Sequence, residues 1–189
     1  MGTPTRTPSP IPGAYRVMTV CTGNICRSPM AEVVLRHRFE AIGLGDAVVV
    51  DSSGISDEET GNPIDPRAAD VLQDAGYPVP RHRAHRVTAK EIAGRDLLLA
   101  MTARHARTLR TLAPDAEVAV RVRMFRSFDP AAPAPSGADA VADEARLDVE
   151  DPWYGERDGF VSVLQEIEAA ADAILDYVRE ELARRPPED

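Results

Sequence analysis

The sequence predicts an α/β domain built on a parallel sheet, and two features indicate it. Short apolar segments rich in β-branched residues alternate with longer segments whose apolar residues recur at helical spacing. The 189 residues, 43% apolar and 28% charged, suffice for one domain with a buried core. We expect a disordered tail at residues 1–13, a single domain at 14–184 and a C-terminal tail at 185–189.

The predicted elements follow in order along the chain. Strands are expected at residues 15–20, 47–51, 96–101 and 116–124, and helices at 29–42, 65–75, 102–112 and 158–183. Gly43 and Gly45 are expected to stop the first helix, and Gly76-Tyr77-Pro78 is expected to stop the second. Residues 129–150 carry three prolines and an acidic run, which predicts a long irregular connection. The apolar stripe of the last helix indicates core packing: Phe160, Val163, Leu164, Ile167, Ala170, Ala171, Ile174, Leu175 and Val178.

Residues 21–28, Cys-Thr-Gly-Asn-Ile-Cys-Arg-Ser, lie between the first predicted strand and the first predicted helix. Ser28 followed by Pro29 is typical of a helix start, with a capping side chain before proline at the first helical position. Unpaired N–H groups and the positive end of the helix dipole meet there, which attracts a phosphate and stabilises a cysteine as its thiolate. The segment is therefore predicted to be a phosphate-binding loop between strand 1 and helix 1, with Cys21 as a nucleophile.

Arg27 and Gly23 suit the same chemistry. The planar guanidinium of Arg27 can bind two phosphoryl oxygens at once, and Gly23 lets the backbone turn inward without a Cβ. The alternative is a buried cysteine at a strand end, a surface arginine and an ordinary turn. The strand before the loop and the helix start after it favour the phosphate site.

The segment from Val20 to Pro29 resembles the signature of the low-molecular-weight protein tyrosine phosphatases. The resemblance extends over roughly residues 16 to 178, and further matches occur in the same order: Ser52-Ser53-Gly54, Asp65-Pro66-Arg67-Ala68, His82-Arg83-Ala84, Asp96-Leu97-Leu98-Leu99-Ala100-Met101 and Asp151-Pro152-Trp153-Tyr154-Gly155. It implies a three-layer α/β/α fold with a four-stranded parallel sheet in the order 2-1-3-4. It also implies hydrolysis of phosphotyrosine through a phosphocysteine intermediate.

The resemblance assigns the proton transfers to Asp151, first as the acid that protonates the leaving oxygen and then as the base that activates water. Negative charge from the bound phosphate and partial burial beside Trp153 would favour the neutral form that the first step needs. On the sequence alone, Asp-Pro is a turn. The phosphate is expected to bind to the loop residues Thr22, Gly23, Asn24, Ile25, Cys26 and Ser28.

Three further residues match family positions whose side chains hydrogen-bond one another and hold the loop in shape. They are Asn24, Ser52 and His82, and Asn24 is expected in a left-handed conformation. The Ser28 hydroxyl can either donate to the sulfur of Cys21 or cap the helix, and the resemblance favours the sulfur.

Trp153 and Tyr154 are expected to wall an aromatic cleft deep enough for a phosphotyrosine ring. Opposite them, Glu58 and Glu59 stand where the family usually carries a Trp-His pair. We expect this acidic wall to favour substrates with basic neighbours or a guanidinium leaving group.

The guanidinium leaving group makes a protein-arginine phosphatase the runner-up function. Ile25 argues against it, because a threonine at that position is associated with the arginine-specific relatives. A thioredoxin-linked arsenate reductase needs further cysteines downstream, and none follow Cys26. A non-catalytic phosphate-binding module is the alternative outside enzymes.

The two cysteines, Cys21 and Cys26, share one loop, which gives no disulfide framework and suits a reducing compartment. Cys26 either packs under the loop or, as the resemblance implies, traps oxidised Cys21 as a disulfide. Because no apolar stretch approaches about 18 residues and the N-terminus lacks the apolar region of a signal peptide, we expect no membrane partner and a cytoplasmic protein. We expect a monomer, and the resemblance implies phosphotyrosine proteins as its partners. The net charge of −9 argues against a nucleic-acid partner. No cofactor or metal is expected, because Arg27 and the backbone donors already neutralise the phosphate.

Overall fold

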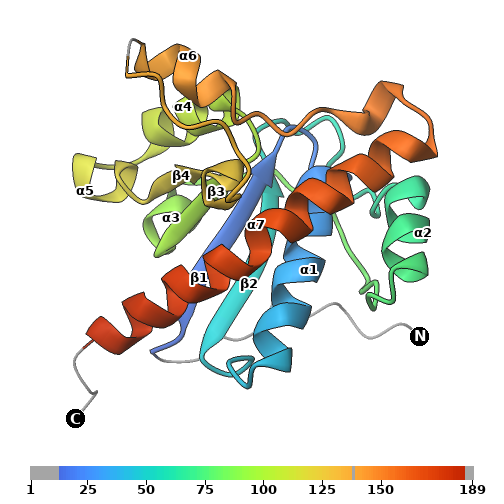
Figure 1. The fold of residues 1–189 in the computed structure, drawn as a ribbon, viewed down its shortest axis with the longest axis horizontal. Helices are drawn as coiled ribbons and strands as arrows, with labels where there is room; N and C mark the ends of the chain where they lie inside the picture. Colours follow the sequence, from blue (N-terminus) through green and yellow to red (C-terminus); the bar gives the residue numbers. More distant parts are fainter. Residues whose placement is uncertain (1–12, 138, 186–189) are drawn as a thin grey trace.

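The computed structural model describes residues 13–137 and 139–185. Its sheet contains β1 (Tyr15–Cys21), β2 (Val48–Gly54), β3 (Leu97–Ala100) and β4 (Val122–Met124), all parallel and in the order β2-β1-β3-β4 (Figure 1). This order confirms the expected fold. Because β1 lies between β2 and β3, Cys21 leaves the sheet at its centre, where ligands of open α/β sheets bind.

Helices cover both faces of the sheet. One face carries α1 (Arg27–Ala41), α2 (Pro66–Asp74) and α7 (Arg157–Arg184), and the other carries α3 (Ala89–Ala93), α4 (Ala103–Leu112) and α5 (Ala116–Ala119). Successive strand residues enter opposite cores: Val17 packs with the first set of helices and Met18 with the second, both fully buried. The strands are therefore apolar on both sides, as parallel strands between two helical layers are.

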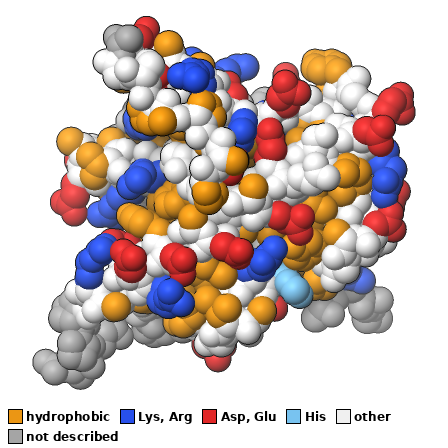
Figure 2. All heavy atoms as spheres, viewed as in Figure 1, with side chains coloured by type: hydrophobic (Ala, Val, Ile, Leu, Met, Phe, Trp, Pro, Cys, Tyr) orange, Lys and Arg blue, Asp and Glu red, His pale blue; other side chains and the backbone are white. Residues whose placement is uncertain are grey.

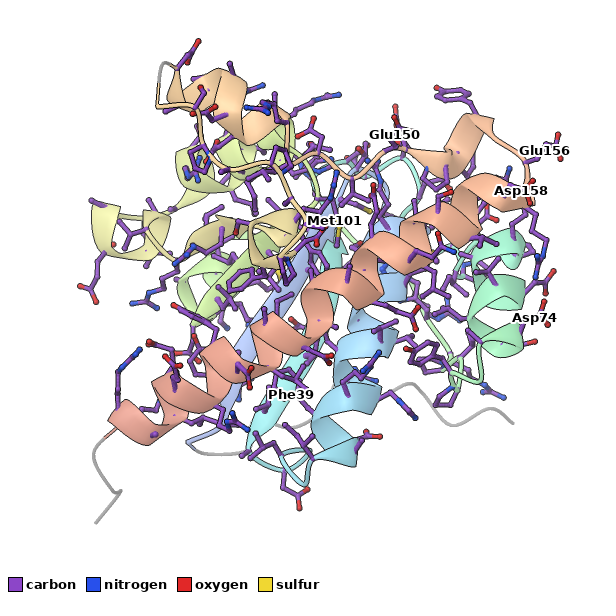
Figure 3. All side chains as sticks on the ribbon, in the orientation of Figure 1. Phe39, Asp74, Met101, Glu150, Glu156 and Asp158 are labelled. Carbon is purple, nitrogen blue, oxygen red and sulfur yellow. The ribbon has the colours of Figure 1, made fainter. Side chains whose placement is uncertain are left out.

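The long helix α7 runs across the sheet beside α1 (Figure 1). Its predicted apolar stripe is buried throughout, together with Phe39 of α1, which Figure 3 labels. At its start, Arg157 pairs with Asp74, the last residue of α2. Figure 2 shows acidic and basic side chains interspersed over the face that carries α7. No helix within the described ranges is long and apolar enough to cross a bilayer.

The expected helix stops are confirmed. Gly43 (φ 77°) and Gly76 (φ 85°) adopt the left-handed backbone that follows a helix end. The first helix nevertheless begins earlier than predicted: α1 starts at Arg27, so Ser28 lies inside its first turn and is not its cap. Pro29 is tolerated there because the N–H groups of a first turn have no partner within the helix.

The predicted strand at 116–124 is wrong in its first half. Asp115 accepts a hydrogen bond from the Val118 N–H at 2.8 Å and thereby starts α5, so that β4 is confined to Val122–Met124. The connection predicted as irregular at 129–150 also contains a helix, α6 (Ala140–Ala145), whose first turn is capped by Asp139. Two 3-10 turns, η1 (Phe125–Phe128) and η2 (Pro152–Tyr154), complete the elements.

Most of the two predicted tails lies outside the described residues. The described parts of both are Gly13 and Arg185, and these two residues contact each other: the Arg185 guanidinium donates to the Gly13 carbonyl at 3.0 Å. Arg185 also pairs with Asp96 at 2.7 Å and lies over the Tyr15 ring. The domain boundaries predicted from composition remain a prediction.

Candidate active site

The loop between β1 and α1 places a backbone N–H and a hydroxyl group beside the sulfur of Cys21. The Asn24 N–H donates to Cys21 Sγ at 3.3 Å, and the Ser28 hydroxyl lies 3.0 Å from the same sulfur. Cys21 itself is only 2% exposed. Of the two roles expected for Ser28, the structure shows the contact with sulfur.

The carbonyl groups of the loop are engaged by neighbouring segments. Those of Cys21, Thr22 and Ile25 accept hydrogen bonds from the N–H groups of Ile55 (3.0 Å), Ser56 (3.0 Å) and Asp65 (2.8 Å). Within the described part of the chain, no acceptor faces the N–H groups of Gly23, Ile25 and Cys26. A loop with engaged carbonyls and free N–H groups is a binding site for an anion.

Asn24 holds the loop in this shape. It is fully buried, and its φ of 60° is the expected left-handed conformation. Its side-chain amide donates to the hydroxyls of Ser28 (3.0 Å) and Ser52 (2.9 Å), and its Oδ1 accepts from the backbone N–H of His85 (3.1 Å).

His82 was expected to hydrogen-bond the side chain of Asn24 or Ser52, but it contacts the backbone of Asn24. His82 Nε2 lies 2.6 Å from the backbone carbonyl of Asn24 and not against its side chain. Burial lowers the pKa of His82, which favours the neutral ring. The Ser52 hydroxyl donates to Glu32 at 2.6 Å, and Glu32 is a partner that the sequence did not reveal.

Arg27 and Asp151 face each other. Arg27 is 4% exposed; its Nη1 donates to the Val149 carbonyl at 3.1 Å, and its Nη2 donates to Asp151 Oδ2 at 2.5 Å. The Arg27 Nε has no partner among the described residues. The other carboxylate oxygen of Asp151 accepts from the Trp153 N–H at 3.2 Å. The buried guanidinium is thus anchored at one end and free to exchange its carboxylate partner for an anion.

A cleft of about 180 Å³ opens beside these groups. It brings together residues from the loop, from both predicted walls and from the segment of Asp151: Cys21, Thr22, Gly23, Ile25, Cys26, Arg27, Glu58, Glu59, Asp151, Trp153 and Tyr154. The side chains of Asn24, Ser28 and Ser52 are buried and are not among those that line the cleft, and His82 contacts the backbone of the loop.

The aromatic wall is held by a residue whose role the sequence did not reveal. The Arg67 guanidinium lies 5.8 Å from the Trp153 ring and donates to the Gly155 carbonyl at 2.9 Å. It also pairs with Asp65 at 2.9 Å. Tyr154 is 93% exposed at the mouth of the cleft.

The acidic wall carries charge that the protein does not neutralise. Neither Glu58 nor Glu59 forms an ion pair with any described residue, although Glu59 accepts a hydrogen bond from Asn62 at 2.7 Å. Glu59 also packs closely on the loop, since a Cβ at Gly23 would lie 2.9 Å from Glu59 Cγ.

The two cysteines differ in their surroundings. Burial, with smaller contributions from Asp65 and Cys21, raises the pKa of Cys26, so Cys26 remains a thiol. Both cysteines are free. In the described ranges no group of three or more His, Cys, Asp or Glu side chains could hold a metal ion.

The sequence also missed His105, a buried residue at the first turn of α4. Its Nε2 lies 2.9 Å from the Thr22 hydroxyl of the loop, and its Nδ1 lies 2.9 Å from the Thr102 hydroxyl. Burial, helped by the positive charges of Arg27 and Arg104, lowers the pKa of His105 to about 3. No local pattern marks this histidine, because its partner in the loop is 83 residues away.

A family model and known proteins match most of the chain. The family model described as low molecular weight phosphotyrosine protein phosphatase matches residues 16–184. The low molecular weight protein-tyrosine-phosphatase of Streptomyces coelicolor is 46% identical over 171 residues, which span 90% of this chain and 98% of that protein. The low molecular weight protein-tyrosine phosphatase A of Mycobacterium tuberculosis is 47% identical over 171 residues, with 90% and 96% covered.

A solved structure of a similar protein has the same fold. The low molecular weight phosphotyrosine phosphatase VcLMWPTP-2 of Vibrio cholerae superposes with a TM-score of 0.75 at 28% identity and covers 89% of this chain and 99% of its own. The chain therefore belongs to the low molecular weight phosphotyrosine protein phosphatase family.

Proposed function

We propose that the protein hydrolyses phosphotyrosine in proteins through a phosphocysteine intermediate, with Cys21 as nucleophile, Arg27 as phosphoryl clamp and Asp151 as general acid and base. The observation that carries this proposal is the convergence of a sulfur, a buried guanidinium and a carboxylate on one cleft. Membership of the family supports phosphoproteins as the substrates.

In the first step the phosphate of the substrate enters the loop and takes the place of Asp151 on Arg27, and Asp151, released from the guanidinium, takes up a proton from solvent. The thiolate of Cys21 attacks phosphorus, the bond from phosphorus to the phenolic oxygen breaks, and Asp151 gives its proton to that oxygen. Arg27 and the free N–H groups of the loop stabilise the charge on the phosphoryl oxygens.

In the second step Asp151 takes a proton from water, and the resulting oxygen attacks phosphorus. The bond from phosphorus to sulfur breaks, which releases inorganic phosphate and restores the thiolate. The Ser28 hydroxyl lies 3.0 Å from the sulfur and donates to the Ser53 carbonyl at 3.2 Å before the reaction; by turning its proton to the sulfur it stabilises the departing thiolate.

The reaction, its cellular compartment and the oligomeric state of the enzyme are parts of the same proposal. We expect the reaction to require no metal ion, since Arg27 and the loop N–H groups supply the positive charge that stabilises the phosphoryl group. We propose that the protein works in the cytoplasm, because a reducing compartment keeps the two neighbouring thiols of Cys21 and Cys26 reduced. We also propose that it acts as a monomer.

The test is turnover of p-nitrophenyl phosphate and of a phosphotyrosine peptide in the presence of EDTA. Cys21→Ser should abolish both activities. Asp151→Asn should slow phenyl phosphate far more than p-nitrophenyl phosphate, because only the poorer leaving group depends on protonation. Asp172→Asn is the matched control, since Asp172 also pairs with an arginine, Arg38, but at an exposed site on α7. Turnover by Cys21→Ser, or no turnover by the wild type, would refute the proposal, and the latter would leave the phosphate-binding module.

A second candidate function, removal of phosphate from arginine side chains, is favoured by the acidic wall. The carboxylates of Glu58 and Glu59, which form no ion pair with a described residue, would attract a guanidinium leaving group. The rates of a phosphoarginine peptide and a phosphotyrosine peptide of the same sequence decide between the two functions.

A further inference from the structure

His105 connects the phosphate-binding loop to α4. It is 1% exposed, and both of its ring nitrogens contact threonine hydroxyls at 2.9 Å: Nδ1 that of Thr102 and Nε2 that of Thr22. A neutral imidazole offers one donor and one acceptor. The Thr102 hydroxyl already accepts the backbone N–H of His105 at 3.3 Å, so its own proton can go to Nδ1. Both contacts are then satisfied, with Nε2–H donating to Thr22.

Thr22 is held on its other side as well. Its backbone carbonyl accepts from the Ser56 N–H at 3.0 Å, and a Cβ at Gly54 would lie 2.5 Å from that carbonyl oxygen. The backbone of Thr22 is therefore fixed by the exit of β2, and its side chain is fixed by α4. The hydrogen bonds of Asn24 hold the opposite side of the loop, toward α1.

The first turn of α4 also holds the segment that carries Asp151. The Ala103 N–H donates to Asp148 Oδ1 at 2.7 Å, and the Val149 N–H donates to the carbonyl of Met101 at 2.8 Å. Figure 3 labels Met101, which directly follows β3. One helix end thus touches both halves of the cleft, the loop through His105 and the acid segment through Asp148.

We infer that His105 is a positioning residue which, through its hydrogen bond to Thr22, fixes the phosphate-binding loop against the segment of Asp151. The inference rests on the proposed function of that site. His105 contacts neither the sulfur nor the carboxylate, and it acts by setting the distance between them. Misplacement of reacting groups by about 1 Å can cost on the order of a hundredfold in rate.

Two substitutions separate this role from mere packing. In His105→Gln the side-chain amide can take the place of Nε2 and keep the bond to Thr22, whereas in His105→Asn it can take only the place of Nδ1. We expect His105→Asn to lower kcat/KM for phenyl phosphate by about tenfold or more, the loss typical of residues that orient catalytic groups, and His105→Gln to restore most of it. The loss should be smaller for p-nitrophenyl phosphate, which depends less on Asp151.

Thr22 supplies the other half of the test. Thr22→Val removes the hydroxyl at constant size and should lose as much as His105→Asn, while Thr22→Ser keeps the hydroxyl and should lose less than Thr22→Val. The double variant should lose no more than the larger single loss, because both changes remove the same bond. Thr108→Val on the same helix is the control, since among the described residues the Thr108 hydroxyl bonds to no group but the Arg104 carbonyl of its own helix.

Equal kcat/KM for His105→Asn and His105→Gln, or multiplying losses in the double variant, would overturn the inference. So would a lower melting temperature with unchanged kcat/KM, which marks a purely structural histidine. If the histidine variants fail to fold, wild-type activity in Thr22→Val still overturns it. Failure of the proposed function is recognised separately, by turnover in Cys21→Ser.

Discussion

Asn24→Ala is the substitution whose cost the structure specifies best. The amide makes three hydrogen bonds, to Ser28, Ser52 and the backbone of His85, at 3.0, 2.9 and 3.1 Å. At a net value of about 1 kcal/mol each, their loss destabilises the fold by about 3 kcal/mol. The left-handed backbone at φ 60° adds about 1 kcal/mol for alanine but nothing for glycine. Asn24→Ala should therefore cost about 4 kcal/mol and Asn24→Gly about 3 kcal/mol.

The assay is urea denaturation of wild type, Asn24→Ala and Asn24→Gly, followed by circular dichroism, together with kcat/KM for p-nitrophenyl phosphate. In a domain of this size, 1 kcal/mol corresponds to roughly 2 to 4 °C in melting temperature. Both variants should also lose activity, because the Asn24 N–H that donates to Cys21 Sγ is positioned by the same side chain. Equal stability of the alanine and glycine variants, or a loss below about 1 kcal/mol, would refute the reasoning.

Three further predictions concern the reaction and its pH range. Arg27→Lys should lower kcat by about a hundredfold or more, because an ammonium cannot hold two phosphoryl oxygens as the guanidinium can; steady-state kinetics measure this, and a change confined to KM would contradict it. Ser28→Ala should slow breakdown of the phosphocysteine and so produce a stopped-flow burst of p-nitrophenol larger than that of the wild type, whereas an absent burst with a slow first turnover would assign Ser28 to the first step. His105, with a pKa lowered from 6.5 to about 3, binds a proton more readily in the unfolded chain, so stability should fall as pH drops from 6.5 toward 3. Urea denaturation across that range should show a smaller fall in His105→Gln, and an identical fall would refute the assignment.

Local patterns predicted the alternation of strands and helices and the position of the loop between β1 and α1. The strand at 15–20, the glycine stops and the alternation of strands with helices depend on neighbouring residues, so the sequence displays them directly. The strand order came from the resemblance, and the structure confirms it. The predicted cleft residues come from segments far apart in the sequence, yet a single cavity is lined by most of them.

The errors have physical causes. At 116–119 the valines suggested a strand, but one capping bond from Asp115 suffices to start a short helix. Ser28 resembled a cap because serine favours that position, whereas here its hydroxyl is engaged by the sulfur and the amide of Asn24. Glu32, Arg67 and His105 were missed because each acts across long sequence separations, on β2, η2 and the loop respectively.

The central claim is that Cys21 carries the phosphoryl group between the two steps. Acid quenching of Asp151→Asn during turnover of p-nitrophenyl phosphate, followed by mass spectrometry of the peptide spanning residues 17–27, tests it directly. We expect one phosphoryl group on the sulfur of Cys21. A phosphoryl group on Cys26 or elsewhere, or turnover that continues with an unmodified peptide at every quench time, would contradict it.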